Sequence, residues 1–178
     1  MSTAARNDIE TMSPDQTEAV GRALGAVLQP GDLVTLEGVL GAGKTVFVRG
    51  LAAGIGVDPM VVRSPTFVLH HVYRGGRIPF HHIDLYRLEG TADLGVAIDI
   101  DELLEDGAVA VEWATPPAQT DGDGRAAVAD GRPLVESIHV SIVAPTSERR
   151  VIRLSPGAPT RAVSIWSELA KAGAPSIR

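Results

Sequence analysis

Cysteine, aromatic side chains and long apolar runs are all scarce or missing in this 178-residue chain. The absence of cysteine excludes disulfide bonds and cysteine-ligated zinc. Aromatic residues make up 4% of the chain, so we expect a core of valine, leucine, isoleucine and alanine. No apolar run approaches membrane-spanning length, and the polar segment Met1–Glu10 lacks the apolar centre of a signal peptide. We therefore expect a cytoplasmic protein that does not enter a membrane.

Positive charge is also in short supply. The chain has 16 lysine and arginine residues against 22 aspartate and glutamate residues, for a net charge of −6. An acidic chain is poorly suited to grip a polyanion over a broad surface. We expect no binding to DNA, and any role near RNA would run through a partner protein or one local patch.

The length of the chain suits one domain with its own core. We expect that domain to occupy residues 1–156. Within it, residues 116–133 are rich in proline, glycine, aspartate and alanine, which predicts a flexible loop or insertion. Residues 157–178 form a tail, in which Ile165 and Leu169 stand four apart and predict a short helix around 164–171.

The most informative segment is residues 38–45, Gly-Val-Leu-Gly-Ala-Gly-Lys-Thr, a complete G-x-x-x-x-G-K-[ST] phosphate-binding loop. The apolar run Leu33–Leu36 before it predicts a strand, and residues 44–53 after it are compatible with a helix. Glycines let successive backbone N–H groups form an anion nest, and the helix N-terminus adds positive charge. We expect nucleotide phosphates to contact the loop and the first helical turn, at Gly41, Ala42, Gly43, Lys44, Thr45 and Val46. In this motif the lysine reaches the β- and γ-phosphates, and the threonine hydroxyl binds Mg²⁺.

Patterns elsewhere predict further helices and strands around this loop. Ser13-Pro14 predicts a helix start, with Gln16 completing a capping box. Gly75-Gly76 predicts a hairpin between two extended segments, Phe67–Tyr73 and Ile78–Ile83. The remaining predicted elements are a short strand at Val61-Val62, one or two short helices in 91–104, a buried strand at 108–111, and strands at 138–143 and 151–154.

Two carboxylates are candidates for completing a magnesium site. Glu112 follows the buried run 108–111, where an acid at a strand's carboxyl end can hold a metal; the alternative is a surface acid. Asp84 follows the extended segment Phe80–Ile83 and could bind metal-linked water or orient an attacking water; the alternative is the N-cap of a turn at 85–87. Ser64-Pro65-Thr66 could approach a γ-phosphate, although the residues alone favour a proline-fixed turn.

Histidines and arginines offer weaker signals. The pairs His70-His71 and His81-His82 cannot chelate one ion from a regular strand, because neighbouring side chains face opposite sides. We expect these histidines, and His139, to be structural or on the surface. Arg149, Arg150 and Arg153 lie in or beside the last hairpin, where one could touch the nucleotide or all could face solvent.

Four motifs occur together in a fixed order: Leu40–Thr45, Ser64–Phe67, His82–Leu88 and Val111–Trp113. This series resembles the TsaE family, formerly called YjeE, which comprises bacterial P-loop ATPases of tRNA threonylcarbamoyladenosine biosynthesis. The resemblance covers roughly Ser13 to Leu154. It implies a single α/β domain of the P-loop NTPase type, with a mixed parallel and antiparallel sheet flanked by helices.

The resemblance also implies an activity and its partners. A member of this family binds ATP or ADP with Mg²⁺, hydrolyses ATP slowly, and supports TsaD and TsaB in modifying tRNA, so contact with tRNA is indirect. Residue by residue, Thr45 and Glu112 match the Mg²⁺ positions, and Lys44, Asp84 and Thr66 match the catalytic set. Ser13, Trp113 and, more loosely, Arg149 match nucleotide contacts.

The chain departs from the family pattern in the loop, where Val39 replaces the usual aspartate. That position is variable in the general motif, so the phosphate cradle should survive. The alternative function is a small-molecule kinase that uses the same loop, although no acceptor site is recognisable. A Ras-like GTPase is disfavoured, because the only asparagine is Asn7, upstream of the loop.

Overall fold

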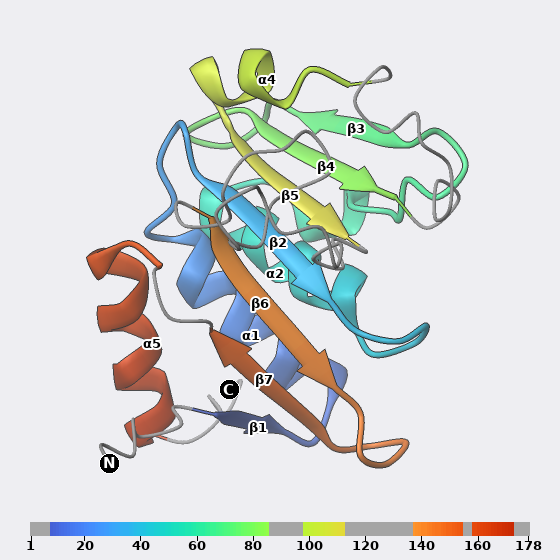
Figure 1. Cartoon of the computed structure of the whole chain (residues 1–178), viewed down its shortest axis with the longest axis vertical. Coiled ribbons are helices and arrows are strands. Elements are labelled where there is room, and N and C mark those ends of the chain that lie inside the picture. The colour runs from blue at the N-terminus through green and yellow to red at the C-terminus, as the bar shows by residue number, and fades with distance from the viewer. Residues whose placement is uncertain (1–7, 86–97, 113–136, 155–157, 173–178) are drawn as a thin grey trace, which may run out of the picture.

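The computed structural model describes residues 8–85, 98–112, 137–154 and 158–172. These residues build a seven-stranded sheet in the order β1-β7-β6-β2-β5-β4-β3 (Figure 1). The strands are β1 (Ile9–Thr11), β2 (Leu33–Glu37), β3 (His70–Tyr73), β4 (Phe80–Asp84), β5 (Ala108–Glu112), β6 (Ile138–Val143) and β7 (Arg150–Leu154). The helices are α1 (Pro14–Gly25), α2 (Lys44–Ile55), the 3₁₀ turn η1 (Pro59–Val61), α4 (Ile100–Asp106) and α5 (Thr160–Ala172).

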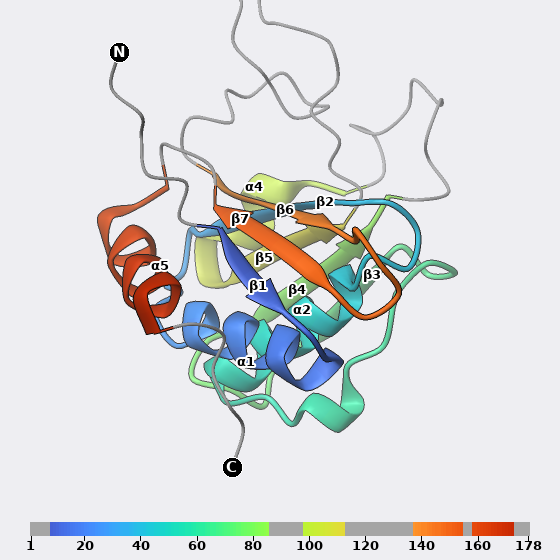
Figure 2. The ribbon, with the colours of Figure 1, turned by 90° about the horizontal axis from the view of Figure 1, so that it is seen from below.

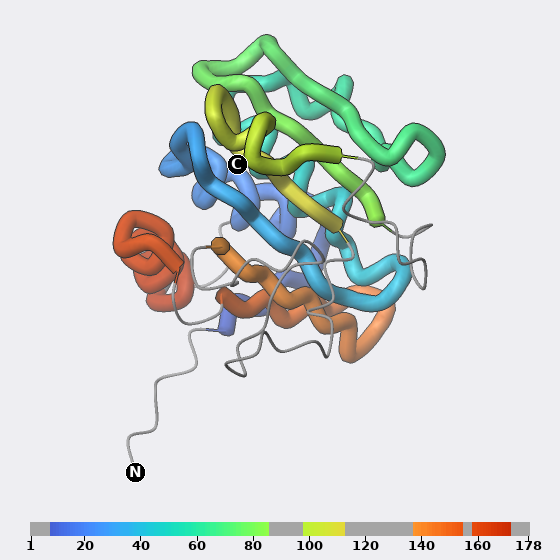
Figure 3. The backbone as a smooth tube through the Cα atoms, turned by 45° about the horizontal axis from the view of Figure 1, so that its top comes forward, coloured from blue at the N-terminus to red at the C-terminus, as the bar shows by residue number. Residues whose placement is uncertain are grey.

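The centre of the sheet is parallel and its flanks are antiparallel. Strand β2 pairs in parallel with β5 and β6, and β5 pairs in parallel with β4. Strands β3 and β7 pair antiparallel with β4 and β6, and β1 pairs antiparallel with β7. Parallel strands end at the same edge, so the carboxyl ends of β2, β4 and β5 lie side by side (Figure 3). The mixed sheet flanked by helices confirms the predicted α/β class.

The two faces of the sheet carry cores of different size. Helices α1 and α2 cover one face, and α4 lies on the other (Figure 2). The larger core gathers the sheet residues under α1 and α2, including Val34, Leu36 and Ile152. The smaller core lies under α4 around Ile83 and Val109. The site described below forms on the α2 face.

Glycines let α1 and α2 pack unusually closely. A Cβ atom placed on Gly21 would lie 2.3 Å from the Phe47 carbonyl oxygen, and one on Gly50 would lie 2.1 Å from the Glu18 oxygen. Real Cβ atoms do not approach backbone oxygens to such distances, so only glycine fits. The phosphate loop therefore leads into a helix whose distance from α1 is set by backbone contact.

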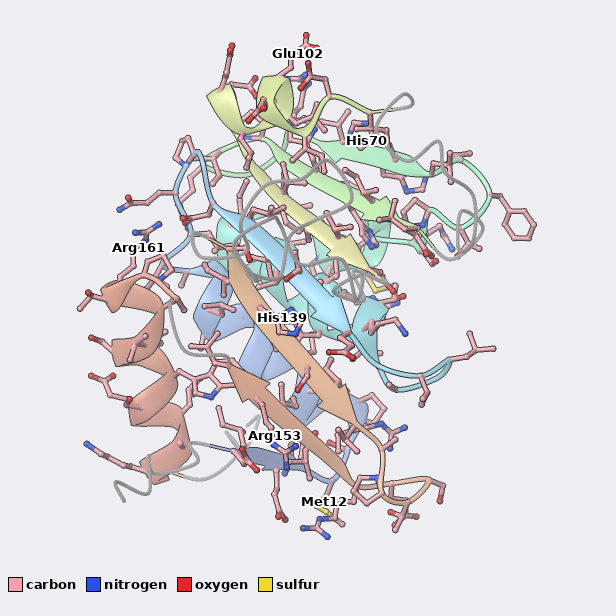
Figure 4. All side chains as sticks on the ribbon, in the orientation of Figure 1. Met12, His70, Glu102, His139, Arg153 and Arg161 are labelled. Carbon is pink, nitrogen blue, oxygen red and sulfur yellow. The ribbon has the colours of Figure 1, made fainter. Side chains whose placement is uncertain are left out.

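Helix α5 lies outside α1 and belongs to the larger core. Trp166 is 1% exposed, and its ring centroid lies 6.5 Å from that of Phe47 in α2. Arg161, labelled in Figure 4, donates to the Val27 carbonyl oxygen and pairs with Asp32. The sequence predicts a short tail helix at 164–171; the helix is longer and packs on the domain. Periodicity detected the helix, but it could not show what its apolar side would contact.

Ser13 caps the start of α1 as predicted, but the Gln16 side chain does not bond back to Ser13. The Ser13 hydroxyl accepts from the Gln16 N–H at 3.2 Å, as an N-cap residue should. The Gln16 side chain accepts from the N–H of Met12, one residue before the N-cap, so the capping box is displaced by one position. The short strand β1 just upstream was not predicted, because Met1–Glu10 reads as polar.

Two extended segments were assigned incorrectly. Val61-Val62 is not a strand, because Pro59 and the Asp58 carboxylate, which accepts from the Met60 N–H at 2.9 Å, favour the helical turn η1. The hairpin around Gly75-Gly76 is confirmed, but its first strand starts only at His70. Residues 65–69 turn back, with the Leu69 N–H donating to the Pro65 carbonyl at 2.6 Å.

The other expected strands, at 33–36, 108–111, 138–143 and 151–154, are present as β2, β5, β6 and β7. One helix, α4, occupies the end of the segment 91–104 and runs on to Asp106, while 91–97 and the proposed loop 116–133 lie outside the described residues. None of the helices in the described ranges combines the length and apolar character that crossing a membrane requires.

Candidate functional site

The phosphate loop connects β2 to α2 in a conformation that requires glycine. Gly41 has φ 77° and Gly43 has φ 107°, both in the left-handed region. Gly43 is also the N-cap of α2, and no side chain bonds to the first N–H groups of that helix. These N–H groups have no intrahelical partners, so they are suited to bind an anion. The loop therefore has the geometry of a phosphate cradle.

Lys44 is the first residue of α2 and folds back over the loop. Its Nζ donates to the carbonyl oxygens of Gly38 and Val39 at 2.7 and 3.0 Å. Burial lowers the pKa of Lys44, while the negative charges of Glu112 and Asp84 raise it. The ammonium group thus lies in the combined field of two carboxylates at the ends of neighbouring strands.

Glu112 ends β5 directly beside the start of α2. The Thr45 hydroxyl donates toward both of its carboxylate oxygens, at 2.8 Å to Oε1 and 3.1 Å to Oε2. Glu112 is 2% exposed, so its carboxylate is buried among polar partners rather than solvated. The structure thus brings together the two residues that the resemblance assigns to Mg²⁺. The prediction placed Glu112 just after the strand; it is the last strand residue.

Hard oxygen donors such as these suit Mg²⁺. Magnesium takes one or two protein carboxylates or hydroxyls and completes an octahedron with water and substrate phosphates. In the described ranges, no group of three or more histidine, aspartate or glutamate side chains could hold a metal. An ion at Thr45 and Glu112 would therefore rely on phosphate and water for its remaining ligands, which fits Mg²⁺ bound with a nucleotide.

Asp84 ends β4, and its register partner on β5 is Glu112. It is buried, and its Oδ2 accepts from the Thr66 hydroxyl at 2.5 Å and the Ser64 hydroxyl at 3.0 Å. The two hydroxyls lie 2.6 Å apart. The Asp84 carboxylate is thus linked to the Ser64-Pro65-Thr66 segment, in which Ser64 is exposed. The predicted catalytic residues Asp84 and Thr66 are in direct contact.

One residue of this site was not singled out from the sequence. His82 is fully buried on β4, and its Nε2 lies 2.8 Å from Glu112 Oε1. From its sequence context alone, His82 is expected to be structural or on the surface. The signal that could have found it is spacing, because His82 and Asp84 are two apart on one strand and face the same side.

Some of the remaining candidates for nucleotide contact lie at the phosphate loop, and others do not. Ser13 uses its hydroxyl to cap α1. The loop is approached instead by Thr17 one turn later, whose Cγ2 would lie 3.9 Å from a Cβ placed on Gly43. Gly41, Ala42 and Val46 lie in the loop and the first turn of α2, as expected. Trp113 lies outside the described residues.

Of the two neighbouring arginines at the last hairpin, Arg150 is the one that reaches the loop. Its Nε donates to the Ala42 carbonyl at 2.8 Å, and its Nη1 donates to the Thr146 and Ser147 carbonyls at 3.1 Å. Arg149 instead forms an ion pair with Glu10. Arg150 therefore links the β6–β7 hairpin to the phosphate loop.

Three other histidines have partners outside the phosphate loop. His70 and His81 stack, with 3.1 Å between His70 Nε2 and His81 Nδ1, and burial lowers the pKa of both. His139 lies on β6, on the sheet face turned toward the viewer in Figure 4. Its ring lies between the Thr35 hydroxyl, 2.9 Å from Nδ1, and the Glu37 carboxylate, 3.4 Å from Nε2.

Comparison with known proteins supports the same assignment. The family model described as threonylcarbamoyl adenosine biosynthesis protein TsaE matches residues 11–150. This chain belongs to the TsaE family. Curated relatives named tRNA threonylcarbamoyladenosine biosynthesis protein TsaE include one from Bacillus subtilis, 43% identical over 106 residues, and one from Streptomyces coelicolor, 47% identical over 96 residues.

The matched segments cover 58% and 53% of this chain, and 64% of each relative. The chain thus spans just under two thirds of the length of the curated TsaE relatives it matches. The crystal structure of Bacillus subtilis YdiB superposes with a TM-score of 0.67 at 28% identity, over 93% of this chain and 94% of that one. The TsaE family assignment and the α/β fold are therefore consistent with each other.

Proposed function

We propose that this TsaE family member is an ATP-binding, Mg²⁺-dependent ATPase that hydrolyses slowly on its own. Its output would be a change in a partner complex of TsaD and TsaB that modifies tRNA with the threonylcarbamoyl group. The family's place in tRNA threonylcarbamoyladenosine biosynthesis supports the pathway. The activity itself is supported by the residues around the phosphate loop.

The contact between Thr45 and Glu112 is the observation that carries this proposal. A hydroxyl at the start of α2 and a carboxylate at the end of the neighbouring strand meet at 2.8 Å beside an open phosphate cradle. This arrangement supplies two oxygen ligands at the place where a nucleotide's β- and γ-phosphates would lie.

Each side chain would have a defined task. The loop N–H groups and Lys44 would bind the phosphates and offset negative charge that develops in the transition state. Thr45 and Glu112 would hold Mg²⁺, which when bound neutralises charge on the β- and γ-phosphates. Asp84 would orient the attacking water or, through Thr66, connect the γ-phosphate to the segment 64–66.

The engagement of Arg150 supports slow turnover by the isolated chain. Its guanidinium bonds to backbone carbonyls of the loop and of the β6–β7 hairpin. Arginines that accelerate phosphoryl transfer instead stabilise the charge that develops on the transferred phosphoryl group. We therefore expect weak ATPase activity in the isolated chain and stimulation when TsaD and TsaB order or complete the site.

The function can be tested by measuring ATP hydrolysis with and without TsaD and TsaB, scoring tRNA modification in the same reactions. We expect stimulation by the partners, and loss of both nucleotide binding and modification in Lys44→Ala. The matched control is Lys171→Ala, which changes the chain's other lysine, exposed on α5. Modification that proceeds equally well without this protein would overturn the proposal. Phosphorylation of an added small-molecule acceptor would favour the kinase alternative.

A further inference from the structure

We propose that His82 is a positioning residue that holds the Glu112 carboxylate in the orientation required to bind Mg²⁺. The inference deepens the proposed function and rests on the metal site at Thr45 and Glu112. The proposed function gives roles to the phosphate loop and the two carboxylates but none to the buried His82. The strand register brings His82 and Glu112 together.

His82 and Glu112 face the same side of the sheet from neighbouring parallel strands. The register partner of His82 on β5 is Ala110, two residues before Glu112 and therefore on the same face. Alanine is small, so the imidazole has room to extend across β5 toward the strand end. Its Nε2 reaches Glu112 Oε1 at 2.8 Å, which is a hydrogen-bond distance.

The buried surroundings of the ring select one tautomer. His82 Nδ1 is buried and has no hydrogen-bond partner among the described residues. The Glu112 carboxylate can only accept a hydrogen bond, whereas a proton on Nδ1 would be a buried donor with no acceptor among the described residues. The proton therefore belongs on Nε2, where it is donated to Glu112.

A glutamate needs such a partner because its last torsion is soft. The χ3 angle of glutamate is broad and roughly two-fold, so the carboxylate plane is not fixed by its own chain. At Glu112, Oε1 lies 2.8 Å from both the His82 ring and the Thr45 hydroxyl. Thr45 would itself be a metal ligand, so the bond from His82 is the contact with Glu112 that comes from a residue outside the metal's own ligands. Hydrogen bonds of this kind to metal ligands are worth about 10–100-fold in metal affinity.

The test compares three replacements of His82 in the full chain loaded with ADP. His82→Leu removes the donor, His82→Gln carries an N–H that reaches about as far as Nε2, and His82→Asn carries one that falls short. The measurements are Mn²⁺ and Mg²⁺ affinity for the ADP complex, ADP affinity without metal, and thermal stability. We expect metal affinity to fall about 10–100-fold in His82→Leu and His82→Asn. Metal-free ADP affinity should be unchanged, and His82→Gln should restore most of the metal affinity.

Two outcomes would overturn the inference: metal affinity in His82→Leu equal to wild type, or His82→Gln as weak as His82→Asn. If His82→Leu does not fold, the comparison of His82→Gln with His82→Asn decides alone. Glu112→Gln, measured in parallel, separates the inference from the proposed function. Full metal affinity in Glu112→Gln would refute the metal site itself. Loss of affinity in Glu112→Gln, with no loss in the His82 variants, would refute only the role of His82.

Discussion

Glu112 and Asp84 occupy equivalent places in the sheet but have different surroundings. Both end a parallel strand, both are buried, and they are direct partners in the β4–β5 register. Glu112 contacts the first turn of a core helix and a fully buried histidine. Asp84 contacts two hydroxyls from the segment 64–66, which belongs to no helix or strand.

This difference indicates separate roles for the two acids, although both stand at the ends of neighbouring parallel strands. An acid whose partners are core elements keeps a fixed geometry, as a metal ligand requires. An acid whose partners are loop hydroxyls can exchange them when the loop moves, as switch segments do around a γ-phosphate. We therefore expect Glu112 to determine metal affinity and Asp84 to determine how the bound nucleotide affects the loop and turnover.

The largest effect should come from neutralising each acid in turn. Glu112→Gln should weaken Mg²⁺ binding to the ADP complex by about 100-fold or more, since it removes a ligand rather than a ligand's partner. Asp84→Asn should leave Mg²⁺ affinity within a few-fold while lowering partner-stimulated ATP hydrolysis about tenfold. Titration calorimetry and steady-state turnover of the two variants would check this. Equal loss of Mg²⁺ affinity in both would contradict the proposed division.

A second effect should appear when α2 is displaced from α1. Gly50→Ala would place a Cβ 2.1 Å from the Glu18 carbonyl oxygen, so α2 must shift. We expect the free energy of unfolding to fall by about 1–3 kcal/mol, as overpacking usually costs. Mg²⁺ affinity should fall as well, because Thr45 moves with the helix. Denaturant melts and calorimetry would measure both.

The control for that change is Gly75→Ala, where an added Cβ meets nothing within 4 Å. This variant should keep wild-type stability and Mg²⁺ affinity. If Gly50→Ala lost stability without any change in Mg²⁺ affinity, the Thr45–Glu112 geometry would not depend on the α1–α2 contact.

A smaller effect should follow from removing the hydrogen bond between Thr66 and Asp84. Thr66→Val keeps the shape of the side chain but removes the hydroxyl that lies 2.5 Å from Asp84. We expect a few-fold loss of partner-stimulated turnover, because Ser64 keeps its own hydrogen bond to Asp84. Metal affinity should not change. A Thr66→Ser variant that failed to restore turnover would argue against the hydroxyl's role.

The smallest effect concerns the ionisation of Lys44. Burial lowers its pKa, and Glu112 and then Asp84 oppose that shift. As pH rises through this lowered pKa, the ammonium loses its proton and ADP affinity should decline earlier than for an ordinary lysine. Over the same interval the unfolded chain binds a proton that the folded chain has lost, so the free energy of unfolding should rise with pH.

The two acids should differ here as well. Glu112 raises the pKa of Lys44 more than Asp84 does. Glu112→Gln should therefore move the alkaline decline in ADP affinity to lower pH than Asp84→Asn does. A pH series of metal-free ADP affinity from neutral to alkaline pH would measure the order, and the reverse order would contradict it.

Local patterns were enough to locate most of the elements around the site. The phosphate loop is a continuous motif, so its glycines and Lys44 could be assigned without knowing what lies nearby. The N-cap at Ser13 and the hairpin at Gly75-Gly76 are likewise encoded by a few adjacent residues. Where neighbours compete, the patterns failed: Val61-Val62 has β-branched side chains, yet Pro59 and Asp58 impose a turn.

Contacts between distant segments could not be predicted in the same way. His82 lies 30 residues from Glu112 in sequence, and Arg150 lies 108 residues from Ala42. Nothing local distinguishes Arg150 from Arg149, since their roles depend on which one points from β7 toward the loop. Trp166 in the predicted tail helix likewise reads as an ordinary aromatic until it packs on Phe47.

The sequence by itself determined the phosphate loop, the kind of fold and the family, because each is written in short runs of residues whose backbone or chemical requirements are local. The tertiary structure decided which carboxylate meets Thr45, which one meets the 64–66 loop, and that a buried histidine supports the first of them. Those outcomes depend on strand order and register, which place side chains from separate strands on one face. Register is a property of the assembled sheet, and no single segment contains it.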